Sequence, residues 1–213
     1  LRTTDVQQRF PDRAGDPYTT FSLAEIRSLD AGSWFLERDP YGQIGAGALS
    51  AADREACRGE KVPTLEEALV WTRDAGWTMN LELKRLPAAM GRFPLVERVL
   101  AMIERVGLPP ERMRISSFKH RWLEEVKALR PDFEVQALIG DQADSPLDWG
   151  PLAFHTYNVR HTLLTDEDIR RHKELGFGLN LFTVNDEDDM RRYMALGVDG
   201  LITDFPQRLA RLG

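Results

Sequence analysis

Three polar side chains alternate along one short apolar run, and their types could do chemistry. Asn80, Glu82 and Lys84 are separated by single apolar residues in the run 79–84. Side chains of a strand point alternately to its two faces, so these three share one face. The other face is apolar, as is required of a strand face that packs on helices in a parallel β/α fold. Glu82 and Lys84 lie about 7 Å apart along such a strand, a spacing that permits an ion pair or the binding of a cation beside an anion.

Two interpretations of this pair are open. It could be a charged pair on a half-exposed strand, or it could line the mouth of a parallel barrel. An ion pair inside a barrel costs several kcal/mol to desolvate unless something compensates. We therefore favour a site that binds ions over a purely structural pair.

The elements that would position this site alternate between strands and helices from residue 64 onward, which is typical of parallel β/α units. Strands are predicted at 79–84, 113–118, 134–139, 179–184 and 200–204, with a weaker sixth at 154–159. Helices are predicted at 64–76, 96–106, 122–129, from 165, at 185–197 with Asn185 as the N-cap, and briefly after Pro206. A (β/α)₈ barrel needs eight strands and typically about 250 residues. The fold class is therefore α/β, a TIM-type barrel that is incomplete, with about its last five strands present.

The front of the chain predicts loops and short helices within the same domain, which is taken to span residues 1–213. Ser22 caps a helix that ends near Asp30, and a second short helix is expected near 50–57. The segment 38–59 is expected to be an inserted loop that crosses one face of the domain.

Composition excludes several classes of protein. The 213 residues include 28 Lys and Arg against 34 Asp and Glu, a net charge of −6, which argues against a nucleic-acid or anionic-membrane partner. No apolar run is long enough to span a membrane, and the single Cys57 cannot form an intrachain disulfide. We expect a soluble, cytoplasmic protein, and the oligomeric state stays open.

The histidines and tryptophans are given structural roles. His120 and His172 are expected to be solvated on helices, and His155 and His161 to be structural. The tryptophans at 34, 71, 77, 122 and 149 are expected in the core or lining a pocket, since they lack basic neighbours in a nucleic-acid pattern.

Seven blocks of the chain, in order, resemble the glycerophosphodiester phosphodiesterase family. They lie at 1–4, 29–35, 59–67, 80–84, 116–118, 182–185 and 197–206. The resemblance implies a TIM-type barrel that hydrolyses a small-molecule glycerophosphodiester to glycerol 3-phosphate and an alcohol, with a divalent metal and two histidines. The family's His-Arg-Gly, Glu-x-Asp and His-Asp blocks are not in this sequence, so no catalytic histidine can be assigned and three front strands are expected to be absent.

The resemblance carries over few site residues. Glu82 corresponds to the third metal ligand and Lys84 to the phosphate contact. Phe182 stands where the family usually has Trp and is expected to line the pocket with Trp34. Because the family's metal ligands are carboxylates, the metal is expected to be Mg²⁺ or Ca²⁺.

Two functions follow. The favoured one is metal-dependent hydrolysis of glycerophosphodiesters in phospholipid and glycerol metabolism, although residues 1–213 alone are expected to be inactive. The alternative is a catalytically inactive barrel remnant that binds a phosphorylated small molecule or a protein partner. Glu82 favours the enzyme, because a binding-only remnant would tolerate Gln or Leu there.

Overall fold

The core of the structure is a curled, all-parallel sheet. A computed structural model describes residues 9–144 and 146–213, so the family-like block at 1–4 lies outside the described residues. The six strands follow one another in the sheet in chain order, and every neighbouring pair is parallel. They are β1 (Met79–Glu82), β2 (Met113–Ser117), β3 (Glu134–Ile139), β4 (Thr156–Arg160), β5 (Gly178–Phe182) and β6 (Gly200–Leu201).

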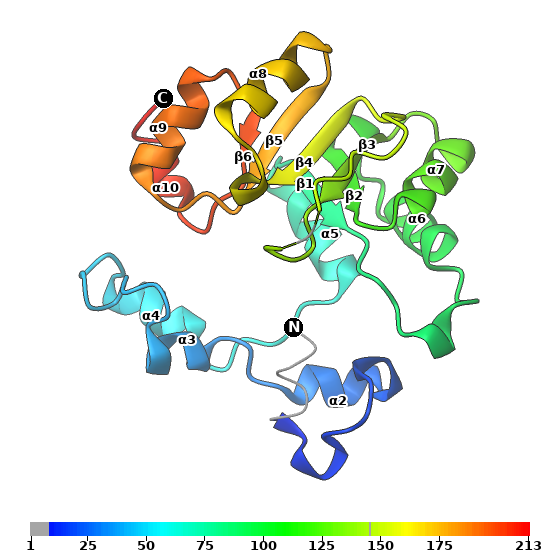
Figure 1. Cartoon of the computed structure of the whole chain (residues 1–213). Helices are drawn as coiled ribbons and strands as arrows, with labels where there is room; N and C mark the ends of the chain where they lie inside the picture. Colours follow the sequence, from blue (N-terminus) through cyan, green and yellow to red (C-terminus); the bar gives the residue numbers. More distant parts are fainter. Residues whose placement is uncertain (1–8, 145) are drawn as a thin grey trace. The chain divides into compact units, whose positions relative to one another are not determined.

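Helices lie around the outside of this sheet, before, between and after the strands (Figure 1). They are α5 (Leu65–Asp74), α6 (Leu95–Val106), α7 (His120–Leu129), α8 (Asp166–Glu174), α9 (Glu187–Ala195) and α10 (Pro206–Leu209). The helix α5 begins with the predicted capping box, in which Thr64 and Glu67 exchange hydrogen bonds. The chain between β3 and β4 is the exception, because its described residues form no helix.

The hydrophobic core lies between the outer face of the sheet and these helices. Ile115, Leu179 and Leu181 on the strands and Ile103 and Leu123 on the helices are fully buried. Burial of one such side chain stabilises the fold by about 1.5–3 kcal/mol. This layer explains why the apolar residues of each strand point outward and leave the polar ones to the interior of the curl.

Aromatic rings fill the outer layer beside β4, where the connecting helix is missing. His172 of α8 stacks on Trp149, with ring centroids 4.3 Å apart, and meets Tyr157 edge-on at 5.5 Å and Phe177 at 5.5 Å. His172 is therefore buried, and the prediction that it is solvated is wrong, because the loop before β4 folds over it. Burial lowers its pKa, and its Nε2 has no hydrogen-bond partner among the described residues.

The chain divides into two compact units. The second unit is Leu69–Arg85 with Pro94–Gly213 and holds the sheet; the first contains the chain up to Ala68 and Leu86–Phe93. The prediction of one domain over residues 1–213 stays a prediction.

The first unit contains three short helices: α2 (Leu23–Ser28), α3 (Ser33–Arg38) and α4 (Ala51–Cys57). The capping boxes at Ser22 and Ser50 confirm α2 and α4 as predicted, whereas α3 was not predicted. The segment 38–59 contains α4, and its role as an inserted loop stays a prediction.

Several boundaries differ from those expected. β1 ends at Glu82 and β6 at Leu201, both shorter than predicted, while the weaker sixth strand is confirmed as β4. Six described strands are two fewer than a closed barrel needs, whereas the resemblance implied that three were absent. The N-cap of α9 is Asp186 and not Asn185, because the Asp186 carboxylate accepts the backbone N–H groups of Asp188 and Asp189.

The tryptophans differ in burial. Trp122 is buried as expected, but Trp71 and Trp77 are 58% and 63% exposed, so their prediction as core or pocket lining is wrong. Their rings pack on each other at 5.4 Å, because Trp71 lies on the side of α5 away from the buried Leu69.

Candidate functional site

The carboxyl ends of the parallel strands bring several side chains to one edge of the sheet, which we call the mouth. It is formed by Glu82 and Lys84 after β1, Phe118 after β2, Arg160 at the end of β4 and Phe182 at the end of β5. Register places Glu82 beside Ser116 and Arg160 beside Phe182. Ligands of open parallel sheets bind at this edge, so the mouth is the candidate site.

The predicted pair is brought together at the mouth. Lys84 Nζ lies 2.7 Å from Glu82 Oε2, and the side chains are 73% and 28% exposed, respectively. Lys84 lies beyond the end of β1, so its ammonium group is largely in solvent while the carboxylate is held in the sheet. A lysine in this position can reach an anion without leaving the carboxylate.

Two buried oxygen atoms beside this pair lack partners. Glu82 Oε1 and Ser116 Oγ are both buried and make no hydrogen bond among the described residues. A buried, unsatisfied polar atom costs about 1–3 kcal/mol, and more when it is charged. Because this cost is high for a carboxylate oxygen, we expect Glu82 Oε1 to bind a cation or a hydrogen-bond donor when the site is occupied.

An aromatic wall stands across the mouth. The Phe118 and Phe182 rings meet edge to face, with centroids 6.0 Å apart. The Arg160 guanidinium lies over the Phe182 ring, with its Cζ 5.5 Å from the ring centroid. The predicted pocket-lining residue Phe182 is thus at the mouth, but its role in binding stays a prediction.

Arg160 was missed by the sequence reasoning. A signal was present, because Asn158 in the weaker predicted strand 154–159 and Arg160 just after it are separated by one apolar residue, as Glu82 and Lys84 are. Trp34, in contrast, lies on α3 of the first unit, where its indole N–H donates to the Ala31 carbonyl at 2.7 Å. Its predicted place in the pocket stays a prediction.

The loop after β5 is tied to the end of β6. Asn185 Oδ1 accepts hydrogen bonds from Thr203 Oγ1 at 3.1 Å and from the Asp204 backbone N–H at 2.9 Å. Its Nδ2 donates to the Asp204 carboxylate at 2.8 Å. Asn185 therefore holds the edge of the mouth instead of capping α9.

A ladder of side-chain amides supports the mouth from below. Asn180 Nδ2 donates to Asn158 Oδ1 at 2.8 Å, and Asn158 Nδ2 donates to Gln136 Oε1 at 2.9 Å. The ladder crosses three strands and is almost fully buried at Asn158 and Gln136, so a shift in register would leave buried amides unpaired. Asn80, predicted to face inward, lines the polar hollow of about 460 Å³ next to this ladder.

The histidines do not gather at the mouth. His155 precedes β4 and so lies at its amino end, and His120 contacts the Leu138 carbonyl at 3.0 Å. His161 follows β4, but its Nδ1 pairs with the Tyr193 hydroxyl at 3.1 Å. Burial lowers the pKa of His161, and its structural role stays a prediction.

A divalent metal fits these residues only in part. Glu82 could supply one carboxylate ligand through the unpartnered Oε1. Across residues 9–144 and 146–213, however, no group of three or more His, Cys, Asp or Glu side chains is placed to hold a metal ion. The described residues therefore supply one ligand of a metal site, the Glu82 carboxylate.

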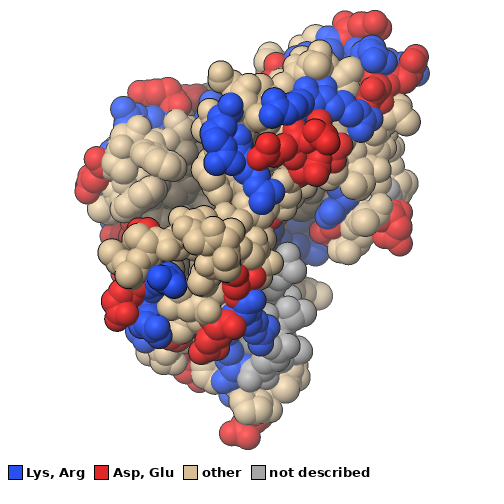
Figure 2. All heavy atoms as spheres, turned by 90° about the vertical axis from the view of Figure 1, so that its left-hand side faces the viewer, with Lys and Arg blue, Asp and Glu red and all other residues tan. Residues whose placement is uncertain are grey.

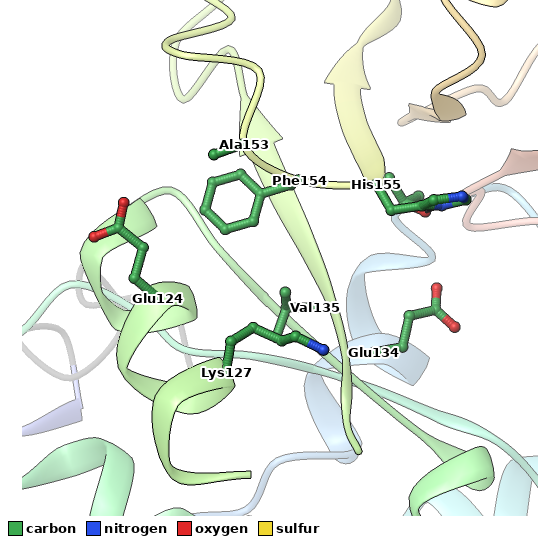
Figure 3. A pocket seen from close by; sticks show the side chains of 8 residues that line it. Glu124, Lys127, Glu134, Val135, Ala153, Phe154 and His155 are labelled. Carbon is green, nitrogen blue, oxygen red and sulfur yellow. Dashed lines mark hydrogen bonds between the residues drawn. The ribbon is translucent and has the colours of Figure 1, made fainter. Parts of the chain in front are cut away.

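A second hollow of about 760 Å³ lies away from the mouth (Figure 3). It separates α7, with Glu124 and Lys127, from the chain at 153–156 that leads into β4. This is the outer face of β3 and β4, where a connecting helix would pack, and Lys127 Nζ is already bonded to the Pro131 and Phe133 carbonyls. The hollow follows from the missing helix and has no buried polar group aimed into it among its lining residues.

One face of the molecule carries charges of both signs. Figure 2 shows Lys and Arg interspersed with Asp and Glu on the face in view. Opposite charges are also paired between Lys173 of α8 and Asp199 before β6, and between Arg191 and Glu187 of α9. Among the described helices, none is both long and apolar enough to cross a membrane.

Comparison with known proteins gives consistent likenesses. The model of the Glycerophosphoryl diester phosphodiesterase family matches residues 1–208. The chain is 32% identical over 196 residues to the glycerophosphodiester phosphodiesterase of Bacillus subtilis (strain 168), covering 87% of this chain and 62% of that protein. It is 29% identical over 194 residues to the glycerophosphodiester phosphodiesterase of Caldanaerobacter subterraneus subsp. tengcongensis, covering 90% and 71%.

A solved structure agrees. The crystal structure of a glycerophosphodiester phosphodiesterase from Parabacteroides distasonis ATCC 8503 is 27% identical, with a TM-score of 0.61, and the match covers 72% of this chain and 65% of that one. This likeness and the curled parallel sheet confirm the predicted TIM-type barrel fold.

Proposed function

Because the chain belongs to the glycerophosphoryl diester phosphodiesterase family, we propose that its mouth binds a glycerophosphodiester for metal-dependent hydrolysis to glycerol 3-phosphate and an alcohol. The observation that carries this proposal is the buried Glu82 Oε1, which has no partner among the described residues, beside the exposed ammonium group of Lys84. A carboxylate that lacks a cation and a lysine within reach of an anion together suit a metal–phosphate pair. Action in phospholipid and glycerol metabolism and a cytoplasmic location stay predictions of this proposal.

The chemistry of a phosphodiester explains the residue types. The diester is an anion, so Lys84 would bind a non-bridging oxygen and offset the charge that grows as water attacks phosphorus. Glu82 would hold a hard cation, Mg²⁺ or Ca²⁺, which withdraws charge from the same phosphate. Phe118 and Phe182 would exclude water from one side of the bound ester.

Turnover needs an acid and a base that the described mouth does not supply. Of the chain's four histidines, His172 is buried in the outer layer and His161 is paired with Tyr193, while His120 at the start of α7 contacts the Leu138 carbonyl and His155 precedes β4. We therefore expect residues 1–213 to bind ligand at the mouth without hydrolysing it. The alternative of a binding-only barrel shares this expectation and differs in not requiring a divalent metal.

Calorimetric titration with sn-glycerol 3-phosphate tests the proposal. Wild-type protein should bind it with Mg²⁺ present and more weakly in a chelator. Lys84→Met should weaken binding by about tenfold or more, as expected for the loss of a charge-assisted hydrogen bond. Lys173→Met on α8, whose ammonium group bridges to Asp199, is the matched control and should bind as the wild type does.

Two results would decide against the proposal. Equal binding by wild type and Lys84→Met would remove Lys84 from the phosphate site. Binding that ignores the chelator would favour the metal-free alternative.

A further inference from the structure

Arg160 is a fixed cation in the mouth with one free side. Its Nε donates to the Gly140 carbonyl at 2.7 Å and its Nη2 to the Asp141 carbonyl at 3.0 Å. In the described chain, no carboxylate lies within ion-pair distance of this guanidinium, and Nη1 has no partner. An arginine held by two carbonyls retains N–H donors, those of Nη1 among them, that are available to a ligand at the mouth.

The backbone is shaped to admit this arginine. Gly140 has φ +87°, and a Cβ there would lie 2.7 Å from Arg160 Cβ and 2.6 Å from Leu163 Cδ1. Any other residue would be strained and would displace Arg160. Phe182 then supports the guanidinium from one side, and Phe118 supports Phe182 edge-on.

Arg160 and Lys84 lie at different parts of the mouth. Lys84 follows β1, whereas Arg160 ends β4, and two further strands separate these in the curled sheet (Figure 1). A phosphate held at Glu82 and Lys84 would leave its ester substituents to extend toward the other walls of the mouth. The inference that follows rests on the proposed function, because it takes that phosphate position as given.

We propose that Arg160 selects the alcohol head group of the substrate and favours oxygen-rich, uncharged or anionic groups such as a polyol or a carboxylate. Nη1 can donate to hydroxyl or carboxylate oxygens of such a group. A choline or ethanolamine head group is disfavoured in two ways. Its positive charge is repelled by the guanidinium, and the Phe182 face that could bind it by a cation–π contact is already occupied by Arg160.

Direct binding to residues 1–213 tests this selection without requiring turnover. Glycerophosphoinositol, glycerophosphocholine and sn-glycerol 3-phosphate are titrated in Mg²⁺ by calorimetry. Wild type should bind glycerophosphoinositol about tenfold more tightly than glycerophosphocholine, the effect of one charge-assisted hydrogen bond. Arg160→Met should bring the two affinities to within about twofold, and it should weaken binding of sn-glycerol 3-phosphate, which has no head group, less than it weakens binding of glycerophosphoinositol.

Control variants separate charge from folding. Arg191→Met removes an arginine of α9 that is 61% exposed and should keep the wild-type preference. Arg160→Lys retains the charge but not the two-carbonyl anchor, so it should keep part of the discrimination against choline. Circular dichroism shows whether each variant is folded.

The outcomes distinguish this inference from the proposed function. If wild type binds none of the three ligands, the proposed function fails and the inference fails with it. If wild type binds sn-glycerol 3-phosphate but shows no preference between the head groups, or if Arg160→Met keeps the preference, the proposed function stands and the role of Arg160 is refuted.

Discussion

The substitution Glu82→Gln is expected to stabilise the protein in the absence of a divalent metal and to make it less stable than the wild type in its presence. Glu82 Oε1 is buried and has no partner in the part of the chain that the structure describes, at a cost of about 1–3 kcal/mol, or more for a charged oxygen. The ion pair with Lys84 contributes at most about 1 kcal/mol to the stability of the folded protein, because the lysine side chain is 73% exposed. Replacing the carboxylate by a neutral amide of the same shape should therefore raise the free energy of unfolding by about 1 kcal/mol in a chelator.

Saturating Mg²⁺ should reverse this order. A ligand that binds only the folded state stabilises it by RT ln(1 + [L]/Kd), about 2.7 kcal/mol at a hundredfold excess over Kd. The wild type should gain this stabilisation, and Glu82→Gln should lose most of it along with the charged ligand. Urea unfolding followed by circular dichroism, in EDTA and in MgCl₂, measures both differences.

Glu174→Gln provides the matched control, because Glu174 is exposed at the end of α8. It should change stability by no more than about 0.5 kcal/mol in either buffer. A Glu82→Gln variant that is clearly destabilised in EDTA would show that the carboxylate has a structural role. Equal stabilisation of both proteins by Mg²⁺ would remove Glu82 from the metal site.

Three further outcomes are expected. The folded pKa of His172 is lowered by burial, so as the pH falls below about 6.5 the unfolded chain binds a proton that the folded chain does not. The wild type should therefore lose more stability between pH 7.5 and pH 5.5, by urea unfolding, than His172→Phe; equal losses would contradict this. Carboxylates such as Asp30, whose pKa is lowered to about 2, titrate below this window. In the described sheet β1 pairs only with β2 and β6 only with β5, so these bare edges should make residues 1–213 associate in size-exclusion chromatography with light scattering, and a stable, cooperatively unfolding monomer would contradict this. Finally, residues 1–213 should release no sn-glycerol 3-phosphate from glycerophosphocholine in a coupled assay, and chelator-sensitive release would show that an acid and a base were overlooked.

Local patterns in the sequence were sufficient for most of the sheet. Apolar runs located all six strands, and the alternation in 79–84 placed Asn80 and Glu82 on the inner face. Capping boxes at Ser22 and Thr64 located helix starts, because each depends on two residues three apart. These features are decided by neighbours in sequence, so one chain is enough to predict them.

Features that depend on distant contacts were not predictable in the same way. His172 has a charged helical neighbourhood in sequence, and only the fold of the loop over Trp149 buries it. Asn185 has the type of a helix cap but is drawn to Asp204, nineteen residues away. The alternation of Asn158 and Arg160 is local, but the Gly140 carbonyl and the Phe182 ring that hold Arg160 come from distant parts of the chain.

Ligand binding at the mouth is tested most directly by NMR. In a titration of isotope-labelled protein with sn-glycerol 3-phosphate and Mg²⁺, the amide signals of residues 82–84, 116–119 and 182–183 should shift together with one apparent affinity. Signals of residues 124–127 and 153–156, around the second hollow, should stay in place and serve as the internal control. Shifts confined to that hollow, or no shifts at all at saturating ligand, would contradict a glycerophosphodiester site at Glu82 and Lys84.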